Sequence, residues 1–127
     1  NISESNATVE TILTENGFTM QKISNIVYLY TKSTADNRRT SKLRIVYDKS
    51  GNIDKSEVEM FIENEKDISM LEALINVLCK SESTDEFIAS IRKQLDGKTS
   101  NAKLTLDNGQ SLRLGKSGGY TEVHTSF

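Results

Sequence analysis

The sequence predicts an α+β domain in which helices pack on one face of an antiparallel sheet of meander strands. Apolar residues recur at helical spacing in three segments and alternate with polar residues in seven others. The two kinds of segment are grouped along the chain rather than interleaved, which favours antiparallel over parallel strands. The expected order is one helix, four strands, two helices and three strands.

Length and composition indicate one domain, residues 1–127, with 35% apolar and 27% charged residues. A chain of this size can bury one core without disulfides or metals. No apolar run approaches the ~18 residues of a membrane span. The net charge of −2 gives no general attraction to nucleic acid. Each half, 6–62 and 67–127, starts with a helix and ends in a meander, which suggests an ancient duplication.

The first helix is expected over residues 6–17. Val9, Ile12 and Leu13 recur at helical spacing, and Asn16-Gly17 forms a natural stop because glycine accepts the left-handed conformation. The period then changes from helical to alternating. Four strands are expected, over residues 18–21, 26–30, 42–47 and 53–62, with a polar loop at 33–40 and a turn at 48–52.

The second helix is expected from Ile68 to about Lys80, with Asp67 as its cap. Its polar stripe contains only Ser69, Glu72, Asn76 and Lys80. A helix so largely apolar must be covered on most sides, so we expect it to lie in the core.

The third helix is expected to open on a capping box, Ser83 and Glu86, and to end at Gly97. Its apolar stripe is narrow and consists of Phe87, Ile88, Ile91 and Leu95. This pattern is typical of a surface helix.

The last three strands are expected over residues 102–106, 111–114 and 120–127. Asn108-Gly109 lies between the first two, and Asn-Gly between alternating segments is a strong hairpin signal. Gly118-Gly119 precedes the final strand.

The segment Asp48–Glu59 imitates a calcium loop, with oxygen-bearing side chains at positions 1, 3, 5 and 7 and a carboxylate at 12. However, the sixth position, which needs glycine, is Ile53, and the flanking residues alternate as strands do. We therefore expect a hairpin turn and no metal site.

Three other patterns have ordinary explanations. His124 is the only histidine and Cys79 the only cysteine, so a catalytic pair would require the fold to bring these two together; we expect His124 to face solvent and Cys79 to lie by the core. Glu57 and Glu59 share a strand face and are expected to be solvated. Residues 115–119 (GKSGG) lack the spacing of a phosphate loop and are expected to form a turn.

A group of basic and aromatic residues is the best candidate for a binding site. It consists of Tyr28, Tyr30, Arg38, Arg39, Lys42 and Arg44, with the two tyrosines on one strand and Lys42 and Arg44 on the next. Such residues are frequent at recognition surfaces. Because the pI is about 5.5, the expected partner is a protein or a glycan and not a nucleic acid.

These observations favour a non-enzymatic binding or interaction module, with no catalytic residues and no cofactor. Because the sequence opens on Asn1 and its strands are rich in Ser, Thr and Asn, we expect the soluble part of a bacterial secreted or envelope-anchored protein, such as a lipoprotein domain. The alternatives are a small cytoplasmic regulator or inhibitor that docks on a protein through its sheet, and a small carboxylate-dependent enzyme.

Overall fold

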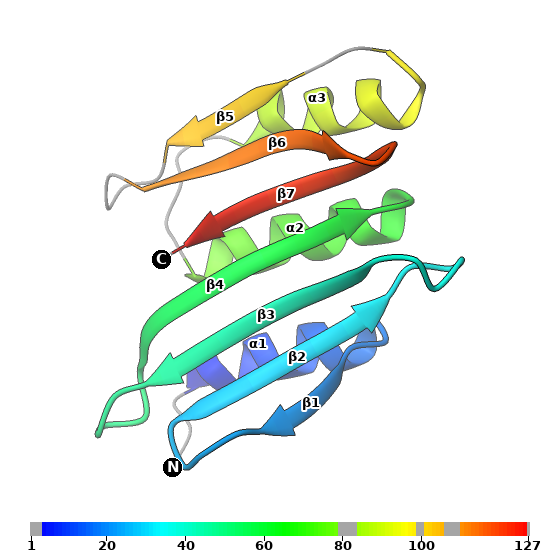
Figure 1. The fold of residues 1–127 in the computed structure, drawn as a ribbon. Helices are drawn as coiled ribbons and strands as arrows, with labels where there is room; N and C mark the ends of the chain where they lie inside the picture. Colours follow the sequence, from blue (N-terminus) through cyan, green and yellow to red (C-terminus); the bar gives the residue numbers. More distant parts are fainter. Residues whose placement is uncertain (1–3, 79–83, 99–100, 106–109, 127) are drawn as a thin grey trace.

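A computed structural model of the chain describes residues 4–78, 84–98, 101–105 and 110–126 (Figure 1). The element order in this part of the chain is the order that the sequence predicts. The elements are α1 (Glu4–Glu15), β1 (Thr19–Lys22), β2 (Val27–Ser33), β3 (Thr40–Tyr47), β4 (Ile53–Ile62), α2 (Glu65–Leu78), α3 (Asp85–Leu95), β5 (Ala102–Thr105), β6 (Ser111–Ser117) and β7 (Tyr120–Ser126).

The strands form one antiparallel sheet in the order β1-β2-β3-β4-β7-β6-β5. Helices α1, α2 and α3 lie on one face of this sheet, with α2 between the other two (Figure 1). The predicted α+β class, with helices on one face of an antiparallel sheet, is therefore confirmed. The two short strands β1 and β5 form the edges.

The two halves of the chain meet at the centre of the sheet, where β4 and β7 pair antiparallel, with Glu59 opposite His124 and Met60 opposite Val123. Strands β4 and β7 are the last strands of their respective halves. Two related units could pack in this way, but the duplication itself stays a prediction.

The core lies between the sheet and the helices, and α2 contributes most of its helical part. Ile68, Leu71, Leu74 and Ile75 are each at most 2% exposed, as the predicted apolar circumference requires. Alternate residues of the central strands point toward them because successive side chains of a strand point to opposite faces. These buried strand residues are Leu43, Ile45, Val58, Met60, Leu112, Leu114 and Val123.

Helix α2 begins earlier than predicted, and Asp67 is not its cap. The Asn64 side chain accepts a hydrogen bond from the Asp67 backbone N–H (3.0 Å), which is the interaction of an N-cap residue. Asp67 lies in the first turn, where its carboxylate accepts the Glu63 N–H (2.8 Å) and pairs with Lys32 (3.3 Å). Lys80, the predicted end, lies outside the described residues.

Helix α3 begins at Asp85, and Thr84 occupies its N-cap without a side-chain capping bond. The predicted capping box is therefore wrong, because Glu86 is the second helical residue rather than the third. Ser83 lies outside the described residues. The predicted stripe is confirmed at Phe87, Ile88 and Ile91, which are buried, while Leu95 is half-buried.

The strand predictions are accurate at β4 and too short at β2 and β3. Strand β2 continues to Ser33 and β3 begins at Thr40, so the loop between them is only residues 34–39. Gly17 follows α1 with a φ of 87°, as the predicted helix stop requires. Strands β5 and β6 pair as predicted, but Asn108-Gly109 lies outside the described residues.

Candidate functional site: the open face of the sheet

The face of the sheet turned away from the helices, here called the open face, carries most of the charged strand residues. Its side chains form rows across the strands, because paired residues of neighbouring strands lie side by side. One row is Lys42, Glu59, His124 and Arg113; the next is Leu29, Arg44, Glu57 and Ser126. Positive and negative side chains thus alternate across the middle of the sheet.

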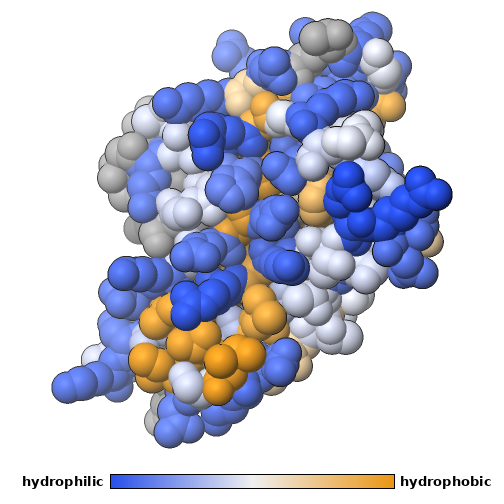
Figure 2. Space-filling view, in the orientation of Figure 1, coloured by the Kyte–Doolittle hydropathy of each residue, from blue (hydrophilic) through white to orange (hydrophobic). Residues whose placement is uncertain are grey.

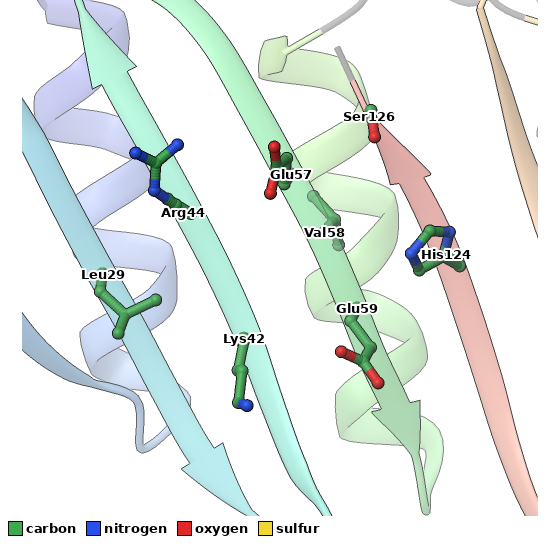
Figure 3. Close-up of a pocket in the computed structure, with 8 residues that line it drawn as sticks. All are labelled: Leu29, Lys42, Arg44, Glu57, Val58, Glu59, His124 and Ser126. Atoms are coloured by element: carbon green, nitrogen blue, oxygen red, sulfur yellow. The ribbon is translucent and has the colours of Figure 1, made fainter.

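A shallow depression of about 200 Å³ lies between these rows (Figure 3). Its lining residues come from β2, β3, β4 and β7, and they are Leu29, Lys42, Arg44, Glu57, Val58, Glu59, His124 and Ser126. Figure 3 shows the charged side chains standing on the near side of the strands, with the helices behind. A depression this open suits contact with another surface better than enclosure of a small molecule.

The charges of the depression are close in register but are not paired with one another. Arg44 lies opposite Glu57, and Lys42 lies opposite Glu59. Within the described residues, none of these four side chains makes a hydrogen bond or an ion pair. In Figure 3 the Arg44 guanidinium is turned away from the Glu57 carboxylate. All four groups are therefore free to meet charges of a partner.

His124 and the two glutamates have the positions expected from the sequence. His124 is exposed, and Glu57 and Glu59 share the open face. The Arg113 Nη2 atom lies 3.5 Å from His124 Nδ1, at the outer limit of a hydrogen bond. Cys79 lies outside the described residues, so the expectation for this residue stays a prediction.

The prediction that the tyrosines share a surface with Lys42 and Arg44 is wrong. Tyr30 pairs with Leu43 and Tyr28 pairs with Ile45, so both rings point to the helix side, whereas Lys42 and Arg44 point to the open face. Tyr30 is fully buried, and the half-buried Tyr28 ring packs edge-on against Tyr47, with 5.2 Å between the centroids. Register between strands, which alternation within a strand leaves undetermined, decides this outcome.

The two arginines of the β2–β3 loop have different surroundings. The loop is held by its own side chains: Thr34 donates to Asp36 (2.7 Å), and Asp36 accepts the Arg38 N–H (3.0 Å). The Arg38 side chain is exposed. The Arg39 guanidinium lies 5.0 Å from the centre of the Tyr120 ring, in a cation–π arrangement. Arg39 therefore has a structural contact, and Arg38 is the arginine left for recognition.

Tyr120 joins this loop to the start of β7, which the sequence did not indicate. Its hydroxyl donates a hydrogen bond to the Asp36 carboxylate. This bond is the main reason that the pKa of Asp36 is lowered to about 2, and the same bond raises the pKa of Tyr120. The Tyr120 ring also packs edge-on against Phe61, which is only 5% exposed although it points to the open face. Contacts among Arg39, Tyr120 and Phe61 therefore cover this corner of the open face.

The turn that resembles a calcium loop connects β3 to β4, as predicted. One oxygen of the Asp48 carboxylate accepts the backbone N–H groups of Ser50 (2.8 Å) and Asn52 (3.0 Å). Gly51 has a φ of 80°, which a turn of this kind needs from glycine. Asp48 thus serves the turn itself.

The GKSGG segment also forms a turn, between β6 and β7, as predicted. Gly118 and Gly119 have φ values of 55° and 88°. A Cβ at Gly118 would meet the Arg39 guanidinium, so the absence of a side chain leaves room for the arginine where it lies.

Comparisons with models of known protein families, with curated proteins and with solved structures found no match. Among the helices that the structure describes, none combines the length and the apolar character needed to cross a bilayer.

Proposed function

We propose that the chain is a non-enzymatic binding module that recognises another protein through the open face of its sheet. One observation carries this proposal. On the face that the helices leave uncovered, Lys42 lies opposite Glu59 and Arg44 lies opposite Glu57, yet among the described residues none of these four side chains forms an ion pair. A mixed array of solvated charges gives a partner both steering and orientation.

A protein partner is favoured over a glycan because of the position of the tyrosines. Tyr28 and Tyr30 were the aromatic rings on which a sugar could have stacked, and both point to the helix side. The lining of the open depression is aliphatic and charged, which suits a polar protein surface.

A small carboxylate-dependent enzyme is the second candidate, because Glu59 lies opposite His124 and beside Glu57 on one face. The openness of the depression weighs against it, because acid–base catalysis gains from a site that excludes water. Loss of both carboxylates in Glu57→Gln/Glu59→Gln would separate the candidates: a binding module changes its affinity, whereas an enzyme loses turnover.

The setting that we propose is outside the cytoplasm, in a secreted or envelope-anchored protein. A cytoplasmic regulator that docks through the same face is the alternative. Fractionation of the source organism, followed by immunodetection, distinguishes the two settings.

The proposed function is tested by reversal of charge on the open face. Lys42→Glu/Arg44→Glu should abolish the capture of a partner that the wild type captures from source-organism extract, and should weaken binding of that purified partner in calorimetric titration. Lys66→Glu/Lys93→Glu is the matched control, because both lysines are exposed on the helix side. Equal effects of the two double variants would exclude the open face as the binding surface.

A further inference from the structure

One end of the open face is apolar rather than charged. Ile23 follows β1 and continues its pairing, because its N–H donates to the Val27 carbonyl (2.9 Å). Val27 pairs with Val46, and Leu29 follows Val27 on the same face. We name Ile23, Val27, Leu29 and Val46 the apolar corner. Figure 2 shows the corresponding hydrophobic area at the lower left, below the charged part of the open face.

The apolar corner is held in place by a structured turn. The Ser24 hydroxyl accepts the backbone N–H groups of Ile26 (3.3 Å) and Val27 (3.2 Å). The Tyr47 N–H donates to the Ile26 carbonyl (2.7 Å), which ties the turn to β3. Ile23 is nevertheless 54% exposed. A preorganised apolar surface of this kind loses little freedom when a partner binds.

Exposed large hydrophobic side chains are concentrated at this hairpin. Among the residues that the structure describes, those exposed are Met20, Ile23 and Ile26, all from the β1–β2 hairpin. Ile23 is the one of these three that points to the open face, since Ile26 lies on the helix side beside Tyr28 and Tyr47. There Ile23 joins the half-buried Val27, Leu29 and Val46, and an apolar patch on an otherwise polar surface commonly marks an interaction site. Met20 pairs with Tyr30 and so points to the helix side, which makes it an internal control for the two faces of one hairpin.

Two of the side chains that border the apolar corner on the open face are cationic, whereas Gln21, opposite Leu29 on β1, is neutral. Arg44 lies directly opposite Leu29, and Lys55 lies directly opposite Val46. Both are exposed, and neither makes a hydrogen bond or an ion pair among the described residues. The acidic residue nearest in register, Glu57, lies one strand beyond Arg44. The chemistry complementary to this border is a carboxylate beside an apolar side chain.

We infer that the apolar corner receives a peptide segment of another protein in which acidic residues stand beside large apolar ones. Its apolar side chains lie on Ile23, Val27 and Leu29, and its carboxylates meet Arg44 and Lys55. This inference rests on the proposed function, since it specifies the chemistry of the partner at one end of the open face. Burial of the apolar corner supplies the affinity, and the two cations set the orientation of the segment.

The inference is tested with a tryptophan peptide, because the chain contains no tryptophan and the peptide's emission is therefore observed alone. The probe is acetyl-Glu-Leu-Trp-Glu-Leu-Glu-amide, titrated with the protein, and its counterpart has lysine in place of each glutamate. The acidic probe should shift to shorter wavelength and bind about tenfold more tightly than the lysine peptide, as expected when an ion pair replaces a repulsion.

Variants locate the probe on the protein. Ile23→Ser and Arg44→Glu/Lys55→Glu should each weaken the acidic probe about tenfold, the size of one lost anchor contact. Met20→Ser, which removes an exposed apolar side chain from the other face of the hairpin, and Lys103→Glu, on the distant strand β5, should leave binding unchanged. Circular dichroism confirms that each variant is folded before it is titrated.

Three outcomes would overturn the inference. The first is equal affinity for the two peptides, and the second is equal effects of Ile23→Ser and Met20→Ser. The third is self-association of the wild type in sedimentation velocity that Ile23→Ser abolishes, because the apolar corner would then be covered by a second copy of the chain. None of these outcomes contradicts the proposed function. If the captured partner is lost with Lys42→Glu/Arg44→Glu but retained with Ile23→Ser, the open face binds and the apolar corner does not. If both variants retain it, the proposed function itself fails.

Discussion

The hydroxyl of Tyr120 donates a hydrogen bond to the carboxylate of Asp36, a residue 84 positions earlier in the chain. The bond joins the loop between β2 and β3 to the first residue of β7. Both residues lie at the surface, and the Arg39 guanidinium stacks on the same phenol ring. The contact therefore couples one half of the chain to the other outside the central β4–β7 pairing.

This bond predicts a specific acid sensitivity. The pKa of Asp36 in the folded protein is about 2, below its value of 3.8 in the unfolded chain. The ionised carboxylate therefore stabilises the fold above pH 4, and this contribution is lost as the pH falls from about 4 to 2. Tyr120→Phe removes the main cause of the shift, so urea unfolding of this variant should depend less on pH in that window than unfolding of the wild type.

Asp54→Asn is the control for the acid experiment, because Asp54 is exposed and makes no hydrogen bond within the described residues. Its pH dependence should match the wild type. If Tyr120→Phe follows the wild-type curve as well, the bond between Asp36 and Tyr120 does not persist in solution.

The buried tyrosines predict the opposite behaviour at high pH. Burial raises the pKa of Tyr30 and of Tyr47. Their hydroxyls lie near each other and near Glu10, but among the described residues neither hydroxyl has a partner at full hydrogen-bond geometry. Below pH 10 both phenols are neutral in either state. As the pH rises past 10 the unfolded phenols ionise first, so the free energy of unfolding falls.

Replacement of these hydroxyls should therefore be harmless at neutral pH and protective at alkaline pH. An unsatisfied buried hydroxyl costs about 1–3 kcal/mol, so Tyr30→Phe and Tyr47→Phe should be neutral or stabilising in urea melts at pH 7. Near pH 11 both variants should lose less stability than the wild type. A loss of more than ~1 kcal/mol at pH 7 would show that the hydroxyls have partners.

Leu74 tests the position of α2. Its side chain is 2% exposed and packs between the sheet and the neighbouring helices. Leu74→Ala should lower the free energy of unfolding by about 2–5 kcal/mol, because the cavity cannot collapse fully. Asn76→Ala, an exposed position on the same helix, should change it by less than ~0.5 kcal/mol. Similar values for the two variants would contradict a central α2.

The local elements of this fold follow from local patterns, whereas the candidate surface does not. Alternation at Leu43, Ile45 and Tyr47 predicts a strand, and the apolar circumference of α2 predicts a core helix. The side of the sheet on which Tyr30 lies depends on its pairing with Leu43, which no pattern within β2 specifies. The contact of Tyr120 with Asp36 depends on β7 lying beside β4, a pairing between distant segments.

Calcium tests the turn between β3 and β4. One oxygen of Asp48 already accepts two backbone N–H groups, and Ile53, where a calcium loop needs glycine, packs on the core. Thermal melts with excess calcium and with chelator should therefore superimpose. A rise of several degrees with calcium would mean that Asp48 leaves its turn to bind the ion.

The two loop arginines should respond differently to charge reversal, although they are neighbours in sequence. Arg38 is exposed, so Arg38→Glu should change the free energy of unfolding by less than ~0.5 kcal/mol. Arg39 lies over the Tyr120 ring, and such a contact contributes about 0.5–1 kcal/mol at an exposed site. Arg39→Glu removes it and places a carboxylate beside Asp36, so its loss should exceed that of Arg38→Glu by about this amount.

Arg39→Gln separates the two effects in this comparison, because it removes the cation without adding a negative charge. It should fall between the wild type and Arg39→Glu in urea melts. In the Tyr120→Phe background, Arg39→Glu should still lower the free energy of unfolding by about the same amount, since phenylalanine offers a ring to the Arg39 cation as tyrosine does. Equal stability of Arg38→Glu and Arg39→Glu would show that the stacked arrangement contributes nothing, and that the loop is held by Thr34 and Asp36 alone.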